Sequence, residues 1–509
     1  MCNDCLTYCL KSSFSKHEGK TAISFFSDGK METEVTYQDL DFDSNRMANC
    51  FLSSGVKKGD RVILFLPKSI GLIVAHLAFQ KIGAISVPLN PGFKHFEMIY
   101  MIEDAVPYLI LTGREQASIV KEINPKFNVM IIDCDIPYQD LDFFRSFKNE
   151  EPPTDIKPED PGIIIYTSGT TGKPKGAVLT QKNLCHDAKN IIRIWEIAKP
   201  DVICHALPLF HVHGLCFALH TALMTGAGVV MLDNFSPDDV VDILMQSEGK
   251  NACTVFMSVP SMYVKMMDFI GERSLNFDHI RLWTSGSAPL LTKDFEKIRT
   301  VFGKEPVERE GMSETGMNFS NPLNGLKKAG SIGLPLPELQ VKIVNPETHE
   351  NLAPGLIGEI WLKGPGVTPG YWQKPEETAS AFKRGWFKTG DLGKVDEDGY
   401  YFLTDRIKNI IISGGENISP KEVETVINRL GNVLGSCVVG IPDEKWGEKV
   451  VAVVILKPGT SLDAEEIKKY CRDNIHKWKT PKEILFVEEI PKNRMGKVLR
   501  KEVKKLFSR

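Results

Sequence analysis

The chain has 509 residues, of which 42% are hydrophobic and 25% are charged. This composition is typical of a soluble globular protein and excludes a disordered or fibrous one. At roughly 150 residues per domain, the length predicts two to four domains. The net charge of −3 disfavours a dedicated nucleic-acid binder, because such proteins are normally basic.

Eleven cysteines are spread along the chain. An odd number, in a chain too large to need disulfides, is typical of reduced thiols and predicts a cytoplasmic protein. Cys2, Cys5 and Cys9 form the only cluster, and we interpret it as part of a frayed N-terminus rather than as a metal site. The first residues lack a basic start followed by an apolar stretch, so no secretion signal is expected.

One long segment without Asp, Glu, Lys or Arg, residues 202–232, invites comparison with a membrane span. It carries four histidines and Pro208, which are costly in lipid because every polar group there needs a partner. We therefore predict a buried strand–loop–helix–strand segment and no transmembrane helix.

Short apolar runs alternate with helical stretches through the first half of the chain. They predict strands over residues 61–67, 84–89, 108–112, 129–133, 162–166 and 229–232, with a helix over 69–81. Apolar strands separated by helices indicate an α/β fold with parallel sheets covered on both faces. After residue 358 shorter strands with glycine turns are expected. From residue 407 a compact lobe follows, with helices from Pro420 and from Asp463 and strands over 437–441 and 450–456.

The most informative segment is the loop of residues 166–176, with the sequence YTSGTTGKPKG. Three glycines, four Ser or Thr hydroxyls and two lysines offer close backbone approach, donors and positive charge, as a polyphosphate requires. The sequence fits neither GxxxxGK(S/T) nor GxGxxG. The alternative interpretation is a flexible surface loop without a ligand. The position of residues 166–176 directly after a buried strand disfavours this alternative.

This loop resembles the phosphate-binding signature of the AMP-forming adenylating enzymes, the superfamily that includes acyl-CoA synthetases, luciferases and peptide-synthetase adenylation domains. The resemblance runs from about residue 20 to residue 505. It implies a large composite N-terminal domain with parallel-rich sheets and a β-barrel-like portion, at residues 1–404. A hinge at 405–409 and a small mobile α+β C-terminal lobe at 410–509 follow. It also implies two half-reactions: a carboxylate attacks the α-phosphate of ATP, and a thiol then captures the acyl-adenylate.

Several segments resemble the family's nucleotide-binding motifs. The ATP- and AMP-binding residues that the resemblance implies are Thr167, Ser168, Gly169, Thr170, Thr171, Gly172, Lys175, Gly286, Ala288, Pro289, Gly311, Met312, Asp391 and Arg406. Glu314 would hold Mg²⁺, which prefers one carboxylate together with phosphate oxygens and water. Thr315 is expected near the α-phosphate. Relatives usually carry an aromatic residue before Gly311 that stacks on adenine, and this chain has Glu310 instead.

The catalytic residues that the resemblance implies are His211, Thr315 and Lys497. His211 belongs to the segment PLFHVHG at 208–214 and would border the carboxylate and the thiol tunnel. Lys497, in the segment PKNRMGK at 491–497, would bridge the carboxylate and the α-phosphate and stabilise charge in the transition state. Lys408 takes the swivel position of the hinge. Gly414 and Gly415 would line the CoA tunnel, where a thiol arm needs backbone without side chains.

The segments at 210–215 and 311–322 resemble the malonyl-CoA synthetase branch. That branch holds the second carboxylate with an arginine after a VPxxY segment, and the matching residue here is Lys265. Lysine keeps the charge and loses the bidentate fork. An apolar acid would instead suit a pocket formed by methionines, namely Met257, Met262, Met266, Met267 and Met317. Methionines at helical spacing, however, often belong only to the hydrophobic core. The predicted substrate is a small-to-medium carboxylic acid, either malonate-like or short aliphatic or alicyclic.

Other functions share some of these features. A stand-alone adenylation enzyme that loads a carrier protein, a luciferase-like enzyme or a long-chain fatty-acid–CoA ligase would carry the same motifs. A serine hydrolase is disfavoured. The segment from Gly311 to Thr315 begins like the G-x-S-x-G pattern, but its last position is Thr315 where that pattern requires Gly. The expected cofactors are ATP, CoA and Mg²⁺, and the expected state is a monomer or homodimer.

The charge is uneven along the chain. Residues 407–509 hold 20 basic and 14 acidic residues, a net charge of +6, which leaves −9 for residues 1–406. A lobe that meets the phosphates of ATP in one step and of CoA in the next would benefit from this excess, although an ordinary solvated surface would also produce it.

Overall fold

The computed structural model describes residues 4–153, 155–167, 173–413, 416–444, 446–492 and 498–507. Contacts divide the chain into two compact units. Unit 1 comprises Met1–Gln340 and Leu362–Phe387, and unit 2 comprises Val341–Trp361 and Lys388–Arg509. The chain therefore passes between the units three times. The segment 405–409 lies within unit 2, and its role as a hinge stays a prediction, as do the domain limits at residues 404 and 410.

Unit 1 contains a six-stranded sheet built from the first apolar runs of the sequence. Its order is β6 (Val129–Ile131), β5 (Leu109–Thr112), β3 (Arg61–Phe65), β4 (Ile85–Pro88), β7 (Pro161–Thr167) and β8 (Lys175–Thr180). All pairs are parallel except β7 with β8. The five strands predicted between residues 61 and 166 are thus confirmed, and so is the predominance of parallel pairing.

A nine-stranded sheet forms the second layer of unit 1. Its order is β15 (Leu334–Pro335), β14 (Gly316–Ser320), β13 (Val307–Met312), β12 (Leu282–Ser285), β11 (Val255–Ser258), β9 (Val202–His205), β10 (Gly228–Leu232), β1 (Thr21–Ser27) and β2 (Lys30–Thr36). Its middle is parallel, and both edges are antiparallel.

The segment without charged residues lies inside this layer as predicted. It forms β9, a π-helix η2 (His213–His220), the short α7 (Thr221–Thr225) and β10. Among the residues that the structure describes, none of the helices has the length and apolar character that crossing a bilayer requires.

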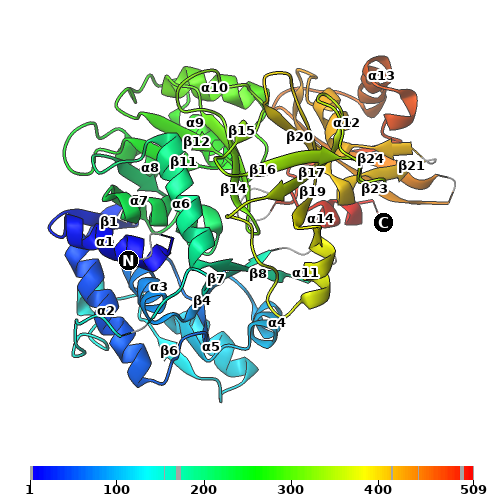
Figure 1. The fold of residues 1–509 in the computed structure, drawn as a ribbon. Coiled ribbons are helices and arrows are strands. Elements are labelled where there is room, and N and C mark those ends of the chain that lie inside the picture. The colour runs from blue at the N-terminus through cyan, green and yellow to red at the C-terminus, as the bar shows by residue number, and fades with distance from the viewer. Residues whose placement is uncertain are drawn as a thin grey trace. The chain divides into compact units, whose positions relative to one another are not determined.

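Helices surround both sheets of unit 1 (Figure 1). They are α1 (Leu6–His17), α2 (Tyr37–Ser53), α3 (Ile70–Ile82), α4 (His95–Ala105), α5 (Arg114–Ile123), α6 (Gln181–Trp195), α8 (Pro237–Leu244), α9 (Pro260–Ile270), α10 (Thr292–Phe302) and α11 (Pro375–Ala381), with a 3-10 turn η1 (Tyr138–Asp140). Every residue of α3 is buried. Its polar side chains are satisfied by distant segments: His76 Nε2 lies 2.9 Å from His220 Nε2, and Gln80 donates to Gly162 O at 3.0 Å.

The N-terminal cysteine cluster corrects one expectation. Helix α1 begins at Leu6, and Leu6, Leu10 and Phe14 recur every four residues to give it a buried apolar stripe. Cys5 is fully buried beside this helix and Cys9 lies within it, so this part of the cluster is ordered rather than a frayed end, and Cys2 lies outside the described residues. Among the described cysteines none forms a disulfide.

The shorter strands after residue 340 form two further sheets. The first has the order β16 (Gln340–Val344), β17 (Gly358–Lys363), β19 (Trp386–Val395) and β18 (Phe382–Lys383), and β20 (Tyr401–Arg406) pairs with β19. The second, within unit 2, has the order β22 (Glu416–Ile418), β21 (Ile411–Ser413), β24 (Gly447–Leu456) and β23 (Val433–Asp443), and β25 (Glu483–Phe486) pairs with β24.

Three helices accompany these strands: α12 (Pro420–Ile427), α13 (Ala464–Asn474) and α14 (Arg500–Lys505). The 3-10 turns η3 (Ile407–Asn409) and η4 (Lys477–Lys479) complete the unit. Helix α12 begins where predicted because Ser419 caps it, accepting from Glu422 N, and Pro420 takes the first turn. The result is an α/β fold with a large N-terminal part and a small C-terminal one, as predicted.

Candidate active site

The phosphate-binding loop connects two antiparallel strands. Thr167 ends β7 and Lys175 begins β8, directly opposite each other in the ladder. The Thr167 hydroxyl donates to Lys175 O at 3.4 Å, and Lys175 Nζ lies 5.3 Å from the centre of the Tyr371 ring. Five further predicted loop residues lie outside the described residues: Ser168, Gly169, Thr170, Thr171 and Gly172.

Asp104 of α4 is a buried carboxylate that joins the end of β7 to residue 374 of unit 1. Tyr166 OH donates to Asp104 Oδ2 at 2.8 Å, and Lys374 Nζ donates to Asp104 Oδ1 at 2.6 Å. Burial and Asp104 both raise the pKa of Tyr166, so its hydroxyl remains a hydrogen-bond donor at neutral pH. Asp104 thereby fixes the strand end from which the loop departs.

The hairpin of β13 and β14 carries two predicted site residues at its tip. Glu314 is 8% exposed, and its Oε1 accepts from Tyr371 OH at 3.0 Å. Its backbone oxygen accepts from Thr368 N at 2.7 Å. Thr315 is 2% exposed, and its hydroxyl oxygen accepts from Asn318 Nδ2 at 2.8 Å. Asn318 also donates to Glu310 Oε2 at 3.1 Å, which gives the unusual Glu310 a partner within the hairpin.

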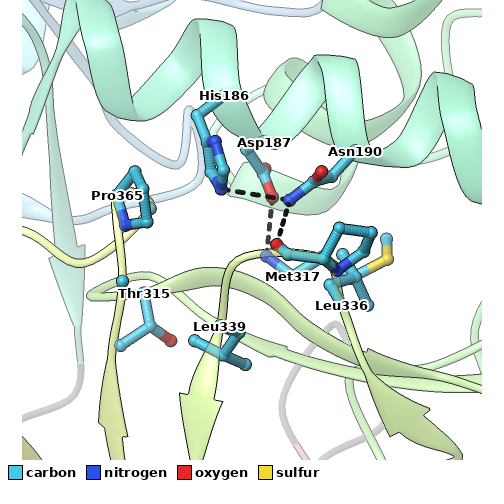
Figure 2. A pocket seen from close by; sticks show the side chains of 11 residues that line it. His186, Asp187, Asn190, Thr315, Met317, Leu336, Leu339 and Pro365 are labelled. Atoms are coloured by element: carbon cyan, nitrogen blue, oxygen red, sulfur yellow. Dashed lines mark hydrogen bonds between the residues drawn. The ribbon is translucent and has the colours of Figure 1, made fainter.

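A small pocket lies between helix α6 and this hairpin (Figure 2). Asp187 of α6 points at the hairpin, and its Oδ1 accepts from Met317 N at 2.8 Å. Burial raises the pKa of Asp187 to about 7, against the opposing effects of the Met317 N–H and of Arg309. The pocket is lined by His186, Asp187, Asn190, Thr315, Met317, Leu336, Pro337, Leu339, Gly364, Pro365 and Gly366.

The segment of the predicted nucleotide-binding residues Gly286, Ala288 and Pro289 borders a buried cation. Arg309 of β13 is 2% exposed, and its guanidinium lies against Gly286, where an added Cβ would come within 2.6 Å of Cζ. Its Cζ lies 5.2 Å from the centre of the Phe217 ring. Neither Nε nor Nη2 of Arg309 has a hydrogen-bond partner among the described residues. Burial lowers the pKa of Arg309 to about 10, so the group is still charged at neutral pH. Ala288 and Pro289 follow Gly286 in the same segment.

The two histidines of the 208–214 segment differ in environment. His211 is half-buried, with its ring centre 4.6 Å from that of Phe210. His213 is 2% exposed and its Nδ1 lies 3.2 Å from Ser287 Oγ. Burial, and then the charge of Arg309, lower the pKa of His213 well below its usual value, so the ring is neutral. The segment is held by His205, whose Nε2 donates to Gly214 O at 2.9 Å while Lys68 Nζ donates to its Nδ1 at 3.2 Å.

Lys265, the residue at which the sequence pattern points for a second carboxylate, is exposed on α9. It lines no part of the described pocket. Met266 and Met267 on the same helix belong to the buried core around Trp283, which supports the plain-core interpretation of these methionines. Met317 is 4% exposed and lines the pocket.

In unit 2 two of the predicted nucleotide-binding residues, Asp391 and Arg406, face each other. Asp391 and Arg406 are paired across β19 and β20, and Arg406 Nε lies 2.6 Å from Asp391 Oδ1. A second contact joins Nη2 to Oδ2 at 3.3 Å. Lys408 is exposed in η3. Gly414, Gly415 and Lys497 lie outside the described residues, so their predicted roles stay predictions.

Sequence reasoning missed Asp104, Asp187, Arg309 and Tyr371. Arg309 had a detectable signal: it stands two residues before Gly311 and directly after the buried residues Val307 and Glu308 of the same strand. The other three contribute single polar side chains from helices and loops that are distant in sequence, and no local pattern marks them.

Comparison with known proteins agrees with this architecture. The model of the AMP-binding enzyme family matches residues 10–372, and that of the AMP-binding enzyme C-terminal domain matches residues 422–497. The mitochondrial malonate–CoA ligase ACSF3 of Bos taurus is 35% identical over 92% of this chain and 86% of its own length. A long-chain-fatty-acid–CoA ligase of Bacillus subtilis is 33% identical over 98% and 94%.

The fold is likewise shared with solved structures. ATP-bound MatB from Rhodopseudomonas palustris superposes with a TM-score of 0.92 at 33% identity, covering 98% of this chain and 99% of that one. The resemblance inferred from the motifs is therefore confirmed: the chain belongs to the AMP-binding enzyme family, as an ATP-dependent, AMP-forming carboxylate–CoA ligase.

Proposed function

We propose that this ligase activates malonate, or a closely similar short dicarboxylate, and transfers it to CoA. The observation that carries the proposal is the buried guanidinium of Arg309. A charged group in the interior is costly unless it is paired, and two of its nitrogens have no protein partner among the described residues. A planar fork of N–H donors matches a carboxylate, so the distal carboxylate of a diacid would complete this site.

The surroundings of Arg309 favour a short anion over an alkyl chain. Gly286 has no side chain that would contact the guanidinium, and His213 Nε2 is a second buried polar atom without a partner among the described residues. A fatty-acid chain would offer neither group a hydrogen bond. Relatives named as malonate–CoA ligases, at 34–36% identity, support the same choice.

The remaining site residues take the roles that their motifs imply. Lys175 and Thr167 would bind the phosphates of ATP together with the loop between them, and Thr315 would lie at the α-phosphate. Glu314 fits a magnesium ligand, because its buried carboxylate is already oriented by Tyr371 and Mg²⁺ takes its other ligands from phosphates and water.

Two further groups of residues act on the ribose and on the reacting atoms. Asp391 and Arg406, prepaired in unit 2, would bind the ribose hydroxyls. Lys497 would stabilise the charge that develops as the carboxylate attacks, and His211 would border the reacting carboxylate. Gly414 and Gly415 would line the path of the CoA thiol.

The first test measures specificity. The purified chain is given ATP, Mg²⁺ and CoA with malonate, methylmalonate, succinate, acetate, butyrate, octanoate or palmitate, and pyrophosphate release and thioester mass are followed. Malonate should give the highest kcat/KM. Activity confined to acids of twelve or more carbons would refute the proposal in favour of a long-chain ligase. Transfer to a carrier protein but not to CoA would refute the choice of acceptor.

The second test addresses Arg309 directly. Arg309→Met keeps most of the volume and removes the cation, so kcat/KM for malonate should fall at least ~30-fold, since losing one partner of a buried charge pair costs about 2–5 kcal/mol. Activity on butyrate should not fall. Lys265→Met, which removes the exposed cation of α9, is the matched control and should stay within about twofold on both acids, because an exposed ion pair contributes little. An equal loss on both acids in Arg309→Met would contradict the assignment.

A further inference from the structure

Helix α6 sends one carboxylate into the base of the β13–β14 hairpin. Asp187 is 7% exposed, and its Oδ1 accepts the backbone N–H of Met317 at 2.8 Å (Figure 2). Met317 follows Glu314 and Thr315 by three and two residues, so this hydrogen bond anchors the strand immediately after the two side chains assigned to Mg²⁺ and the α-phosphate. The other wall of the pocket comes from residues 336–339 and 364–366.

The neighbouring glycine shows how closely the carboxylate fits the turn. Gly316 has φ +70°, a left-handed conformation that favours glycine. A Cβ at this position would lie 2.8 Å from Asp187 Oδ1 and 2.9 Å from Cγ. The backbone of the turn can therefore keep this conformation only with glycine at position 316. Position 187 must hold an acceptor no larger than the Asp carboxylate.

Asp187 also interacts electrostatically with Arg309, the cation assigned to the acid. The charge of Arg309 favours the ionised carboxylate, and Asp187 in turn favours the charged guanidinium. Two roles are thus open to Asp187: a counter-charge for Arg309, or an anchor for the hairpin. The direct hydrogen bond to Met317 N favours the second, because removing the carboxylate would leave a buried backbone N–H without an acceptor and the turn would have to move.

We propose that Asp187 is a positioning residue for the adenylation step, which holds the Gly316–Met317 turn so that Glu314 and Thr315 present their side chains to the phosphates. This inference rests on the roles proposed above for Glu314 and Thr315. It is independent of which acid the enzyme uses.

The test is ATP–pyrophosphate exchange, run with whichever acid the wild type uses best, so that rejection of malonate would leave this test intact. Asp187→Ala should lower kcat about 10- to 100-fold, because displacing a catalytic constellation by about 1 Å costs up to ~100-fold. The KM for the acid should change less than about threefold. Asp187→Asn keeps an oxygen that can accept from Met317 N, and it should restore kcat to within about threefold of the wild type.

Asn190→Ala is the matched control from the same helix. Asn190 lies one turn after Asp187 in the same pocket and donates to Pro337 O at 3.1 Å, not to the hairpin. Its exchange activity should stay within about threefold of the wild type. A loss confined to the KM for the acid, with no rescue by Asp187→Asn, would show that Asp187 serves only as the counter-charge of Arg309 and would overturn the proposal.

A second pair of variants tests the same contact from the hairpin side, should Asp187→Ala fail to fold. Gly316→Ala drives a methyl group against the Asp187 carboxylate. Gly303→Ala introduces the same residue at φ +76°, where the nearest atom to an added Cβ is 3.8 Å away. Both substitutions carry similar backbone strain. Exchange should fall at least tenfold in Gly316→Ala only, and equal activities in the two variants would contradict the proposal.

Discussion

The pKa of a side chain in this molecule depends on its surroundings, as the half-buried thiols of Cys9 and Cys134 show. Cys9 of α1 lies 3.5 Å from the sulfur of Cys185 on α6. The Cys185 thiol, and more weakly the charge of Lys189, lower the pKa of Cys9 to about 7. Burial raises the pKa of the Cys134 thiol to about 11.

Alkylation should therefore distinguish the two. The thiolate is the reactive form, so near pH 7 about half of Cys9 should be reactive and only about one Cys134 in 10⁴. Iodoacetamide at pH 7, followed by peptide mass spectrometry, should label Cys9 well before Cys134. Raising the pH to 9 should reduce the difference between the two labelling rates, because it increases the thiolate fraction of Cys134 far more than that of Cys9. Equal labelling rates at pH 7 would contradict the assignment.

Arg309 and Lys265 show what the sequence could predict of the site at this scale. The family resemblance predicts roles for Glu314, Thr315 and Asp391, since these lie in local segments whose residue order is itself the signal, and these roles stay predictions. The second-carboxylate cation was sought at Lys265, on the helix that follows the VPxxY segment. The structure exposes Lys265 and buries Arg309. Packing between strands and helices that are far apart in the sequence determines which of the two cations is buried. The spacing of residues within a motif contains no information about this packing.

Helices and strands with a strong local sequence pattern could be predicted. Those whose conformation depends on contacts with distant segments could not be predicted as well. The apolar runs at β3, β4, β5, β7 and β10 predicted strands correctly because four or five consecutive buried residues have few other solutions, whereas β6 is only partly buried. Helix α1 was missed as an ordered element because its three apolar anchors are separated by polar residues and cysteines. The π-helix η2 has no local signature. It contacts α3 through the His220–His76 pair, in which one Nε2 donates to the other at 2.9 Å.

This histidine pair predicts acid sensitivity of the element. Burial lowers the pKa of His76 to about 3, below the usual 6.5, so the unfolded chain binds more protons and stability falls as the pH drops below about 6.5. Between pH 7 and pH 5 this one residue should remove about 2 kcal/mol. The urea midpoint of the wild type should fall over this range, and His76→Gln should flatten the decline. Replacing the exposed His476 by Gln should leave the decline unchanged.

At the scale of the whole molecule, the two units have separate hydrophobic cores. Val438, Val450 and Ile467 belong to a cluster drawn entirely from unit 2, whereas Val87, Ile63 and Ile110 belong to one drawn from unit 1. The unit limits were not predictable from linker composition, because β17 and β19 carry the chain from one unit to the other without a break in strand structure.

Separate cores predict separate unfolding. Calorimetry should resolve two transitions, since each unit can lose its core without the other. Val438→Ala and Val87→Ala each remove buried methyl groups and should cost roughly 1–3 kcal/mol. Each should lower the temperature of a different transition. A single transition shifted equally by both substitutions would contradict independent units.

Helix α3, buried along its whole length, also constrains the order in which the chain can fold during synthesis. His76 takes its partner from residue 220, and Gln80 takes its partner from residue 162. When the ribosome has just completed α3, neither partner has yet been made. The six-stranded sheet therefore cannot reach its final state as a nascent N-terminal intermediate, because the chain must extend to residue 220, 144 residues beyond His76, before His76 Nε2 has its partner.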